Sequence, residues 1–309
     1  MRGLLLTQFF MERYFKLSEY LKERFGERVY KISIDGGFTC PNRDGTISRG
    51  GCIFCNESGS GEHTFNGSIK EQMEKGIDFA AKRGKGNKYI AYFQSFTSTY
   101  APLDVLKARY AEALVCKKVV GLAIATRPDC IDDEMCKAIK EVAEDRLVWV
   151  ELGLQTANED TAKIINRGYD NSVFENAVRL LKSNGIQVVV HLIAGLPNEG
   201  SQDFIDSVKY IADKDIDGIK FHSLYVEEGT ALAKLYKSGS YAPISREEYV
   251  KSVCEAIAIL PKRIVVHRVT GDGEKSKILA PLWTKDKKKN LNEITKHLVE
   301  NNIVQGCKI

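Results

Sequence analysis

The sequence lacks a long apolar stretch. None of its 309 residues belong to a run approaching the roughly 18 apolar residues of a membrane span. The first ten residues carry an apolar run without a small-residue cleavage site, and the charged residues Glu12 and Arg13 soon follow, which argues against a secretory signal. Because 43% hydrophobic and 28% charged residues are ordinary for a globular protein, disorder is excluded as well. We therefore expect a cytoplasmic protein with no membrane partner.

Several standard catalytic signatures are also missing. No G-x-x-x-x-G-K-[ST] phosphate loop, no H-E-x-x-H motif and no G-x-S-x-G nucleophile elbow occurs in the chain. These absences argue against the common NTPase, metalloprotease and serine hydrolase classes.

The eight cysteines are unevenly spaced. Three of them, Cys40, Cys52 and Cys55, follow the pattern C-x11-C-x2-C, and the other five are scattered. Disulfides are rare in cytosolic proteins, so the group of three indicates metal or redox chemistry. Three thiolates from one loop can hold three irons of a [4Fe–4S] cluster and leave the fourth iron open to an external ligand. A tetrahedral zinc site is the alternative, and His63 would be its fourth ligand.

Strand-like and helical segments alternate along the chain. Strands are expected at residues 29–34, 89–94, 119–126, 147–155, 188–194 and 218–224, and helices at 14–25, 69–82, 103–115, 133–142, 172–183 and 202–212. The strands are nearly continuous Val, Ile and Leu runs, as in a parallel sheet covered on both faces. Six β/α units predict an α/β fold, a partial (β/α)6 TIM-like barrel, with a doubly wound open sheet as the alternative. Polar motifs follow several strands, where a barrel places its chemistry.

The pattern changes after residue 224. A helix is expected around 247–260, then a strand at 264–269 and a basic helical tail. We expect an N-terminal helical segment (1–28), a β/α core (29–224) and a C-terminal extension (225–309). Residues 261–309 carry 11 Lys and Arg against 5 Asp and Glu, a net charge of +6, and include the run TKDKKK. This excess favours a polyanionic partner, although a solvated face gives the same pattern.

The segment 31–55, KISIDGGFTCPNRDGTISRGGCIFC, resembles the signature of the YhcC/YtqA-type radical S-adenosylmethionine (SAM) enzymes. These enzymes are relatives of the radical SAM domain of the elongator catalytic subunit, and the resemblance runs from Arg13 to the region of Trp283. It implies one [4Fe–4S] cluster held by Cys40, Cys52 and Cys55. It also implies SAM bound at the open iron, cleavage of SAM to a 5′-deoxyadenosyl radical, and an electron donor of the flavodoxin or ferredoxin type.

The same resemblance implies SAM contacts at the strand ends. The residues concerned are Gln94 and Ser95 at the amino group, Glu151 and Gln155 at the ribose and methionine, and His191, Gly195 and Leu224 at the adenine side. Arg127 is expected to pair with a carboxylate of SAM or substrate, and Arg268 and Asp272 to point toward the barrel mouth. The simpler alternatives are helix capping for Ser95 and Asp129 and a satisfied core histidine for His191. Glu151 needs a specific partner in either case, because a carboxylate inside a buried strand is costly.

Two further features bear on the activity. Tyr169, in the loop NRGYD, stands where the family usually has histidine, which weakens a proton-transfer role for that loop. A second C-x-x-C motif is missing, which argues against an auxiliary cluster and a methylthiotransferase. The elongator relationship and the basic tail favour tRNA as partner, with action on the C5 side chain of a wobble uridine, for example a carboxymethylaminomethyl group. The alternatives are a small metabolite or tetrapyrrole substrate, or a non-catalytic Fe–S or zinc module that binds RNA.

Overall fold

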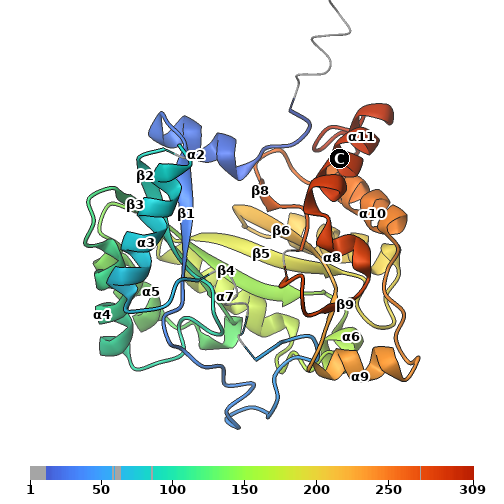
Figure 1. The fold of residues 1–309 in the computed structure, drawn as a ribbon, viewed down its shortest axis with the longest axis horizontal. Helices are drawn as coiled ribbons and strands as arrows, with labels where there is room; N and C mark the ends of the chain where they lie inside the picture. Colours follow the sequence, from blue (N-terminus) through green and yellow to red (C-terminus); the bar gives the residue numbers. More distant parts are fainter. Residues whose placement is uncertain (1–11, 58, 60–63, 85, 272) are drawn as a thin grey trace, which may run out of the picture.

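The computed structural model describes residues 12–57, 59, 64–84, 86–271 and 273–309. Its main feature is a sheet of seven strands with parallel neighbours throughout (Figure 1). In spatial order these are β1 (Val29–Ile34), β2 (Lys88–Phe93), β3 (Val119–Thr126), β4 (Leu147–Gln155), β5 (Gln187–Ala194), β6 (Gly218–Ser223) and β8 (Val265–Arg268). In a doubly wound sheet the strand order would reverse at a switch point. Here the spatial order of the strands is the same as their order along the chain. The sheet curls, so the predicted partial barrel is confirmed.

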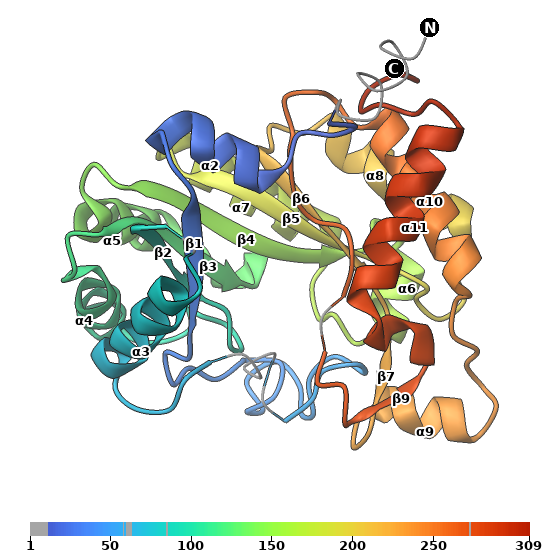
Figure 2. The same cartoon turned by 45° about the horizontal axis from the view of Figure 1, so that its top comes forward.

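Helices between successive strands cover the outer face of the curled sheet (Figure 2). They are α3 (Ile69–Lys82), α4 (Leu103–Leu114), α5 (Asp133–Ala143), α7 (Asn171–Ser183) and α8 (Ser201–Ala212). Three of them begin at a side chain that accepts a backbone N–H, namely Ser68, Asp132 and Asp170. Their apolar faces and the outer face of the sheet form the largest hydrophobic core.

The strand expected within the C-terminal extension belongs to the main sheet. β8 pairs in parallel with β6, so the sheet has one strand more than the six predicted units and continues past residue 224. The helices α10 (Arg246–Ile259) and α11 (Lys287–Glu300) follow the predicted pattern. Shorter elements were not predicted, because they are too short to show a period: α6 (Glu159–Ile164), α9 (Ala231–Lys237), the ribbon of β7 (Val226–Glu227) with β9 (Ile278–Ala280), and 3-10 turns at Pro128–Cys130 and Leu282–Lys285. The proposed domain boundaries stay predictions.

Helix α2 (Leu17–Phe25) closes one end of the barrel (Figure 2). Its buried residues Leu17 and Leu21 pack in one cluster with inward-facing side chains that include Ile90, Tyr92 and Trp149. Ile90 and Trp149 lie in the first half of β2 and β4, so the barrel is filled at its N-terminal end. The opposite end is left for a site.

The segment before α2 is fastened to residues far along the chain. The Phe15 N–H donates to Gln305 Oε1 at 2.8 Å, and the Gln305 N–H donates to the carbonyl of Arg13 at 2.8 Å. The Gln305 amide also donates to the carbonyls of Pro261 and Ile264, and the Val266 N–H of β8 donates to the carbonyl of Phe15. One glutamine thus joins the start of α2 to β8. Among the helices of the described residues, none is long and apolar enough to span a membrane.

Candidate functional site

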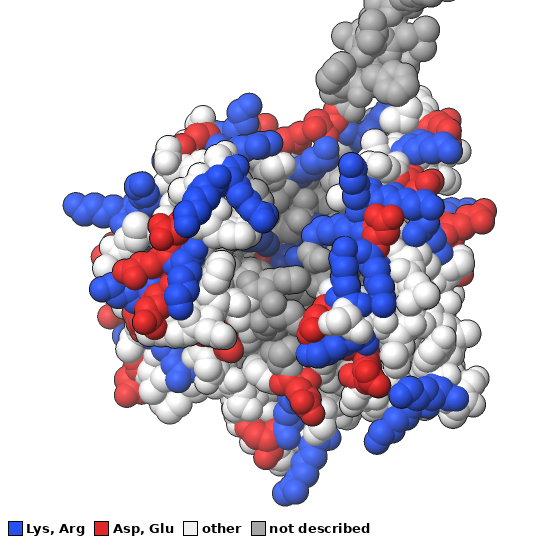
Figure 3. Space-filling model, in the orientation of Figure 1, with Lys and Arg blue, Asp and Glu red and all other residues white. Residues whose placement is uncertain are grey.

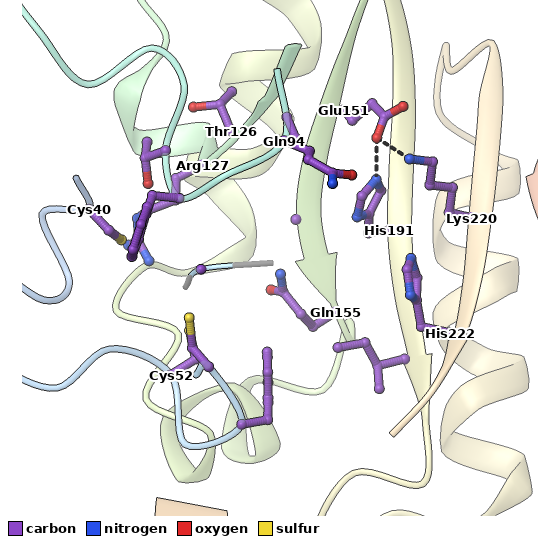
Figure 4. Close-up of a pocket in the computed structure, with 18 of the residues that line it drawn as sticks. Cys40, Cys52, Gln94, Thr126, Arg127, Glu151, Gln155, His191, Lys220 and His222 are labelled. Carbon is purple, nitrogen blue, oxygen red and sulfur yellow. Dashed lines mark hydrogen bonds and ion pairs between the residues drawn. The ribbon is translucent and has the colours of Figure 1, made fainter. Parts of the chain in front are cut away.

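A cavity of about 270 Å³ lies at the C-terminal ends of the strands. It is lined by residues of β2, β4, β5, β6 and β8 together with all three clustered cysteines. Figure 4 shows Cys40 and Cys52 on one side and Glu151, His191 and Lys220 on the other, with Gln94 and Gln155 between them. The cavity therefore has a thiol side and a charged side.

The three cysteines on the thiol side form no disulfide, are partly exposed and lie on one loop. Asn42 Nδ2 donates to Cys52 Sγ at 3.7 Å, and Arg43 Nη1 donates to Cys55 Sγ at 3.3 Å. Burial and the neighbouring Cys55 raise the pKa of Cys52 to about 12. No group of three His, Cys, Asp or Glu side chains among the described residues is close enough to hold a single metal ion, whereas a four-iron cluster binds each thiolate through a different iron. The donor set and its N–H···S contacts fit such a cluster, and His63 lies outside the described residues.

The cysteine loop is fixed by the segment that follows α6. Asn42 is fully buried, and its Nδ2 also donates to the carbonyl of Asn166 at 2.6 Å. The Asn166 amide returns a hydrogen bond to the carbonyl of Gly51 at 2.8 Å, and the Ile53 N–H donates to the carbonyl of Ile165 at 3.1 Å. Both ends of the loop are therefore held by residues more than a hundred positions away. The sequence of either segment alone does not predict this contact.

Arg127 lines the cavity, but its guanidinium already has a carboxylate partner. Its Nε and Nη2 donate to the two oxygens of Asp129 at 2.9 and 2.6 Å, and Nη1 donates to the carbonyl of Arg167 at 2.9 Å. The guanidinium is thus paired within the chain, and its expected pairing with a carboxylate of SAM or substrate stays a prediction. Asp129 does not cap α5 either, since that role belongs to Asp132. The Tyr169 ring lies between the guanidinium groups of Arg127 and Arg167, at 4.9 and 4.7 Å.

The charged side centres on Glu151, which is 1% exposed. Its carboxylate accepts hydrogen bonds from Tyr92 Oη at 2.7 Å, from Trp149 Nε1 at 2.9 Å and from the Lys220 ammonium. His191 Nε2 lies 2.9 Å from the same carboxylate. Burial alone would raise the pKa of Glu151, but the ammonium groups of Lys220 and Lys31 outweigh burial and hold it well below its usual range. We call Tyr92, Trp149, Glu151, His191 and Lys220 the Glu151 cluster.

The Glu151 cluster modifies two predictions. Glu151 has the specific partners expected of a buried carboxylate, but they are protein groups that already occupy its oxygens. His191 matches the alternative of a satisfied core histidine, although its ring still lines the cavity. Burial and Lys220 lower the pKa of His191 to about 4, so the ring is neutral at neutral pH.

The structure brings together most of the remaining predicted residues. Gln94, Gln155, Leu224 and Arg268 line the cavity, whereas Ser95 and Gly195 do not. The Ser95 hydroxyl is buried and has no hydrogen-bond partner among the described residues.

The space beside Gly195 is occupied by another side chain of the protein. With φ at +85°, an added Cβ would lie 2.7 Å from Ile244 Cγ2, and its carbonyl accepts the Tyr241 hydroxyl at 2.7 Å. Ile244 therefore approaches Gly195 closely, and the expected contact of Gly195 with SAM stays a prediction. Asp272 lies outside the described residues.

Several residues that line the cavity were not predicted as site residues. They include Tyr92 on β2, Lys220 and His222 on β6, and Glu227 on β7. The Glu227 carboxylate is 2% exposed and accepts the Asn56 amide at 2.9 Å. Lys220 was detectable, because the argument applied to Glu151 holds equally for a lysine in a buried strand. Glu227 gave no such signal, because its strand has only two residues.

Basic side chains gather near the hollow of the molecule. Figure 3 shows Lys and Arg on both sides of the central hollow, with Asp and Glu interspersed. Lys288 and Lys289 of the TKDKKK run are exposed at the start of α11. The predicted basic tail is thus a surface feature close to the barrel.

Comparison with known proteins gives consistent matches. The family model described as the Radical SAM superfamily matches residues 40–211, and the Radical_SAM C-terminal domain matches residues 216–300. YtqA of Bacillus subtilis is 41% identical, covering 96% of this chain and 92% of that protein, and YhcC of Escherichia coli is 37% identical, covering 93% and 92%. The structure of Elp3 from the archaeon Methanocaldococcus infernus, solved with an N-terminal deletion, superimposes with a TM-score of 0.72 at 20% identity. That match covers 90% of this chain and 64% of the Elp3 chain, and it shows a shared fold.

Proposed function

We propose a function from the premise that this chain belongs to the radical SAM superfamily. The cofactors of the superfamily are a [4Fe–4S] cluster and SAM. When bound and reduced, these cofactors would supply one-electron cleavage of SAM to methionine and a 5′-deoxyadenosyl radical, the species that would abstract a hydrogen atom from the substrate. In this chain Cys40, Cys52 and Cys55 are proposed to bind three of the irons.

The observation that carries the proposal is that three cysteine thiols and several amide side chains line one cavity. Asn42 and Arg43 donate to the thiols at one side, and such N–H···S bonds tune the potential of an iron–sulfur cluster. Gln94 and Gln155 stand between the two sides and are proposed to orient SAM.

We further propose that the substrate is tRNA and that the reaction alters the C5 side chain of a wobble uridine. The resemblance to the radical SAM domain of the elongator catalytic subunit supports this substrate. The net charge of +6 in residues 261–309 supports it independently, because basic residues release counterions from nucleic acid on binding.

The test is an anaerobic turnover experiment. The protein is reconstituted with iron and sulfide, mixed with SAM and a strong reductant, and offered tRNA from a strain that lacks the gene. Mass spectrometry then quantifies 5′-deoxyadenosine and the tRNA nucleosides. C52A should lose both iron and turnover, whereas C307A, which changes an exposed thiol outside the cavity, should keep both.

The outcomes separate the parts of the proposal. A tRNA-dependent rise in 5′-deoxyadenosine with an altered wobble nucleoside is the expected result. SAM cleavage with unaltered tRNA and salt-insensitive tRNA binding would keep the radical chemistry and favour a small metabolite or tetrapyrrole. No cleavage by fully loaded protein would favour a non-catalytic RNA-binding module.

A further inference from the structure

The charged side of the cavity holds a positive charge that the Glu151 cluster does not neutralise. Lys220 is paired with Glu151. Arg268 lines the same cavity from β8, and no hydrogen bond or ion pair joins its guanidinium to any of the residues that the structure describes. A cation facing a partly enclosed cavity without a partner is costly unless a ligand supplies the opposite charge.

The backbone holds Arg268 beside two other donors. Lys220 and Arg268 are register partners on the neighbouring strands β6 and β8. His222 lies two residues after Lys220, so both side chains project from the same face of β6. All three line the cavity.

His222 adds an unused polar atom to this wall. Its Nε2 is buried and has no hydrogen-bond partner among the described residues. The ring lies 5.2 Å from the His191 ring, close to the Glu151 cluster (Figure 4). A guanidinium and an imidazole nitrogen are therefore both left to bind a ligand.

We propose that Arg268 and His222, supported by Lys220, form a subsite that binds a carboxylate of the substrate. Arg268 supplies the charge and the two-pronged geometry that a carboxylate matches, and His222 supplies a third hydrogen bond. The proposal rests on the proposed function, since it names a chemical feature of the group on which the enzyme acts.

The charge balance favours a carboxylate over a phosphate. Among the described lining residues of this wall, Arg268 is the cation left over once Lys220 has paired with Glu151. Lys31 also acts on Glu151 but does not line the cavity, so one positive charge faces a ligand, and one charge suits a monoanion. A phosphate monoester carries about −1.5 to −2 at neutral pH and would call for more cations. The position also argues against the carboxylate of SAM, because Lys220 and His222 lie across the cavity from the cysteines (Figure 4).

The experiment compares two nucleosides that differ only in the carboxylate. Binding of 5-carboxymethylaminomethyluridine and of 5-methylaminomethyluridine to the reconstituted protein is measured by calorimetry, together with N-methylglycine, inorganic phosphate and SAM. The carboxylate-bearing nucleoside should bind about tenfold to a hundredfold more tightly, as expected for hydrogen bonds to a charged group. R268Q should abolish this preference without weakening SAM binding. R179Q, at an exposed position of α7, is the matched control and should keep the preference.

A second readout separates binding from structure. Because Arg268 has no ion-pair partner among the described residues, R268Q should unfold at the same or a higher temperature than the wild type. H222A keeps every charge and should reduce the preference only in part. Loss of the preference together with general destabilisation of both variants would mean that these residues are structural.

The remaining outcomes are distinct. N-methylglycine bound in an Arg268-dependent way, with neither nucleoside bound, would keep the subsite and overturn the tRNA proposal. Equal binding of both nucleosides by wild type and R268Q would overturn the subsite and leave the tRNA proposal standing. Weaker SAM binding by R268Q would assign the wall to SAM, and phosphate binding as tight as N-methylglycine would overturn the carboxylate assignment.

Discussion

Glu151 on β4 and Lys220 on β6 form an ion pair across the intervening strand β5, and each residue is 1% exposed. Removing two charges from water costs several kcal/mol per ion, and the mutual attraction offsets this only when further donors satisfy the carboxylate. Tyr92, Trp149 and His191 are those further groups. The pair thus depends on its whole surroundings, and these come from β2, β4, β5 and β6.

Breaking this ion pair should destabilise the protein. K220M leaves the Glu151 carboxylate buried without its main partner, so the free energy of unfolding should fall by about 3–5 kcal/mol in urea titrations. The double variant E151Q/K220M, which has neither charge of the pair, should recover most of the loss. A change within about 0.5 kcal/mol in K220M would contradict the role given to the pair.

The stability should also decline in mild acid. His191 has its pKa lowered from 6.5 to about 4 by burial and by Lys220. The unfolded chain therefore takes up the proton first, so this contribution is complete above pH 6.5 and is lost as the pH falls toward 4. In H191Q, the difference in unfolding free energy between pH 7 and pH 4.5 should shrink by about 2 kcal/mol. An unchanged difference would show that His191 does not titrate in this way.

Gly195 should tolerate alanine poorly because of Ile244. The φ angle is +85° at both Gly195 and Gly229, but an added Cβ meets Ile244 at 2.7 Å in the first case and nothing within 4 Å in the second. G229A measures the backbone strain alone, about 1–2 kcal/mol. G195A should lose about 1–3 kcal/mol more, from overpacking. Equal losses of unfolding free energy in G195A and G229A, measured by urea titration, would contradict the packing role of Ile244.

Asn42 should be required for retention of iron. N42D replaces the amide donor with an oxygen that faces the Asn166 carbonyl and Cys52 Sγ. We expect a loss of about 1–3 kcal/mol in stability and faster release of iron from the reconstituted protein, followed by visible absorbance. N176D, at an exposed position on α7 where the side-chain oxygen accepts from Arg179, should behave as wild type. Equal iron retention in the two variants would overturn the anchoring role of Asn42.

The sequence allowed the sheet and the thiol side of the cavity to be predicted, because these features depend on local patterns. The bounds of β1, β3 and β4 agree with the expected ones, since each strand is rich in β-branched and other apolar residues and is followed by polar ones. The Cys40–Cys55 spacing likewise lies within one segment.

The unpredicted features depend on pairings between distant residues. The partner of Arg127 is Asp129, the neighbour of Gly195 is Ile244, and β8 joins the sheet through β6. None of these pairings leaves a periodic signal. The sequence patterns also left the partners of Arg127 and Glu151 unidentified. In the folded chain, both side chains bond to residues of the protein itself.

The hydrogen bond between Phe15 and Gln305 joins residues 290 positions apart, and it has a consequence for synthesis on the ribosome. At about 5–20 residues per second, the segment before α2 waits roughly 15–60 s before Gln305 has been added. Strands β1 to β6 can emerge and pair in order during that time, because each follows its neighbour in the chain. Docking of this segment is therefore a late event in the life of the nascent chain, and the open barrel is exposed to chaperones until then.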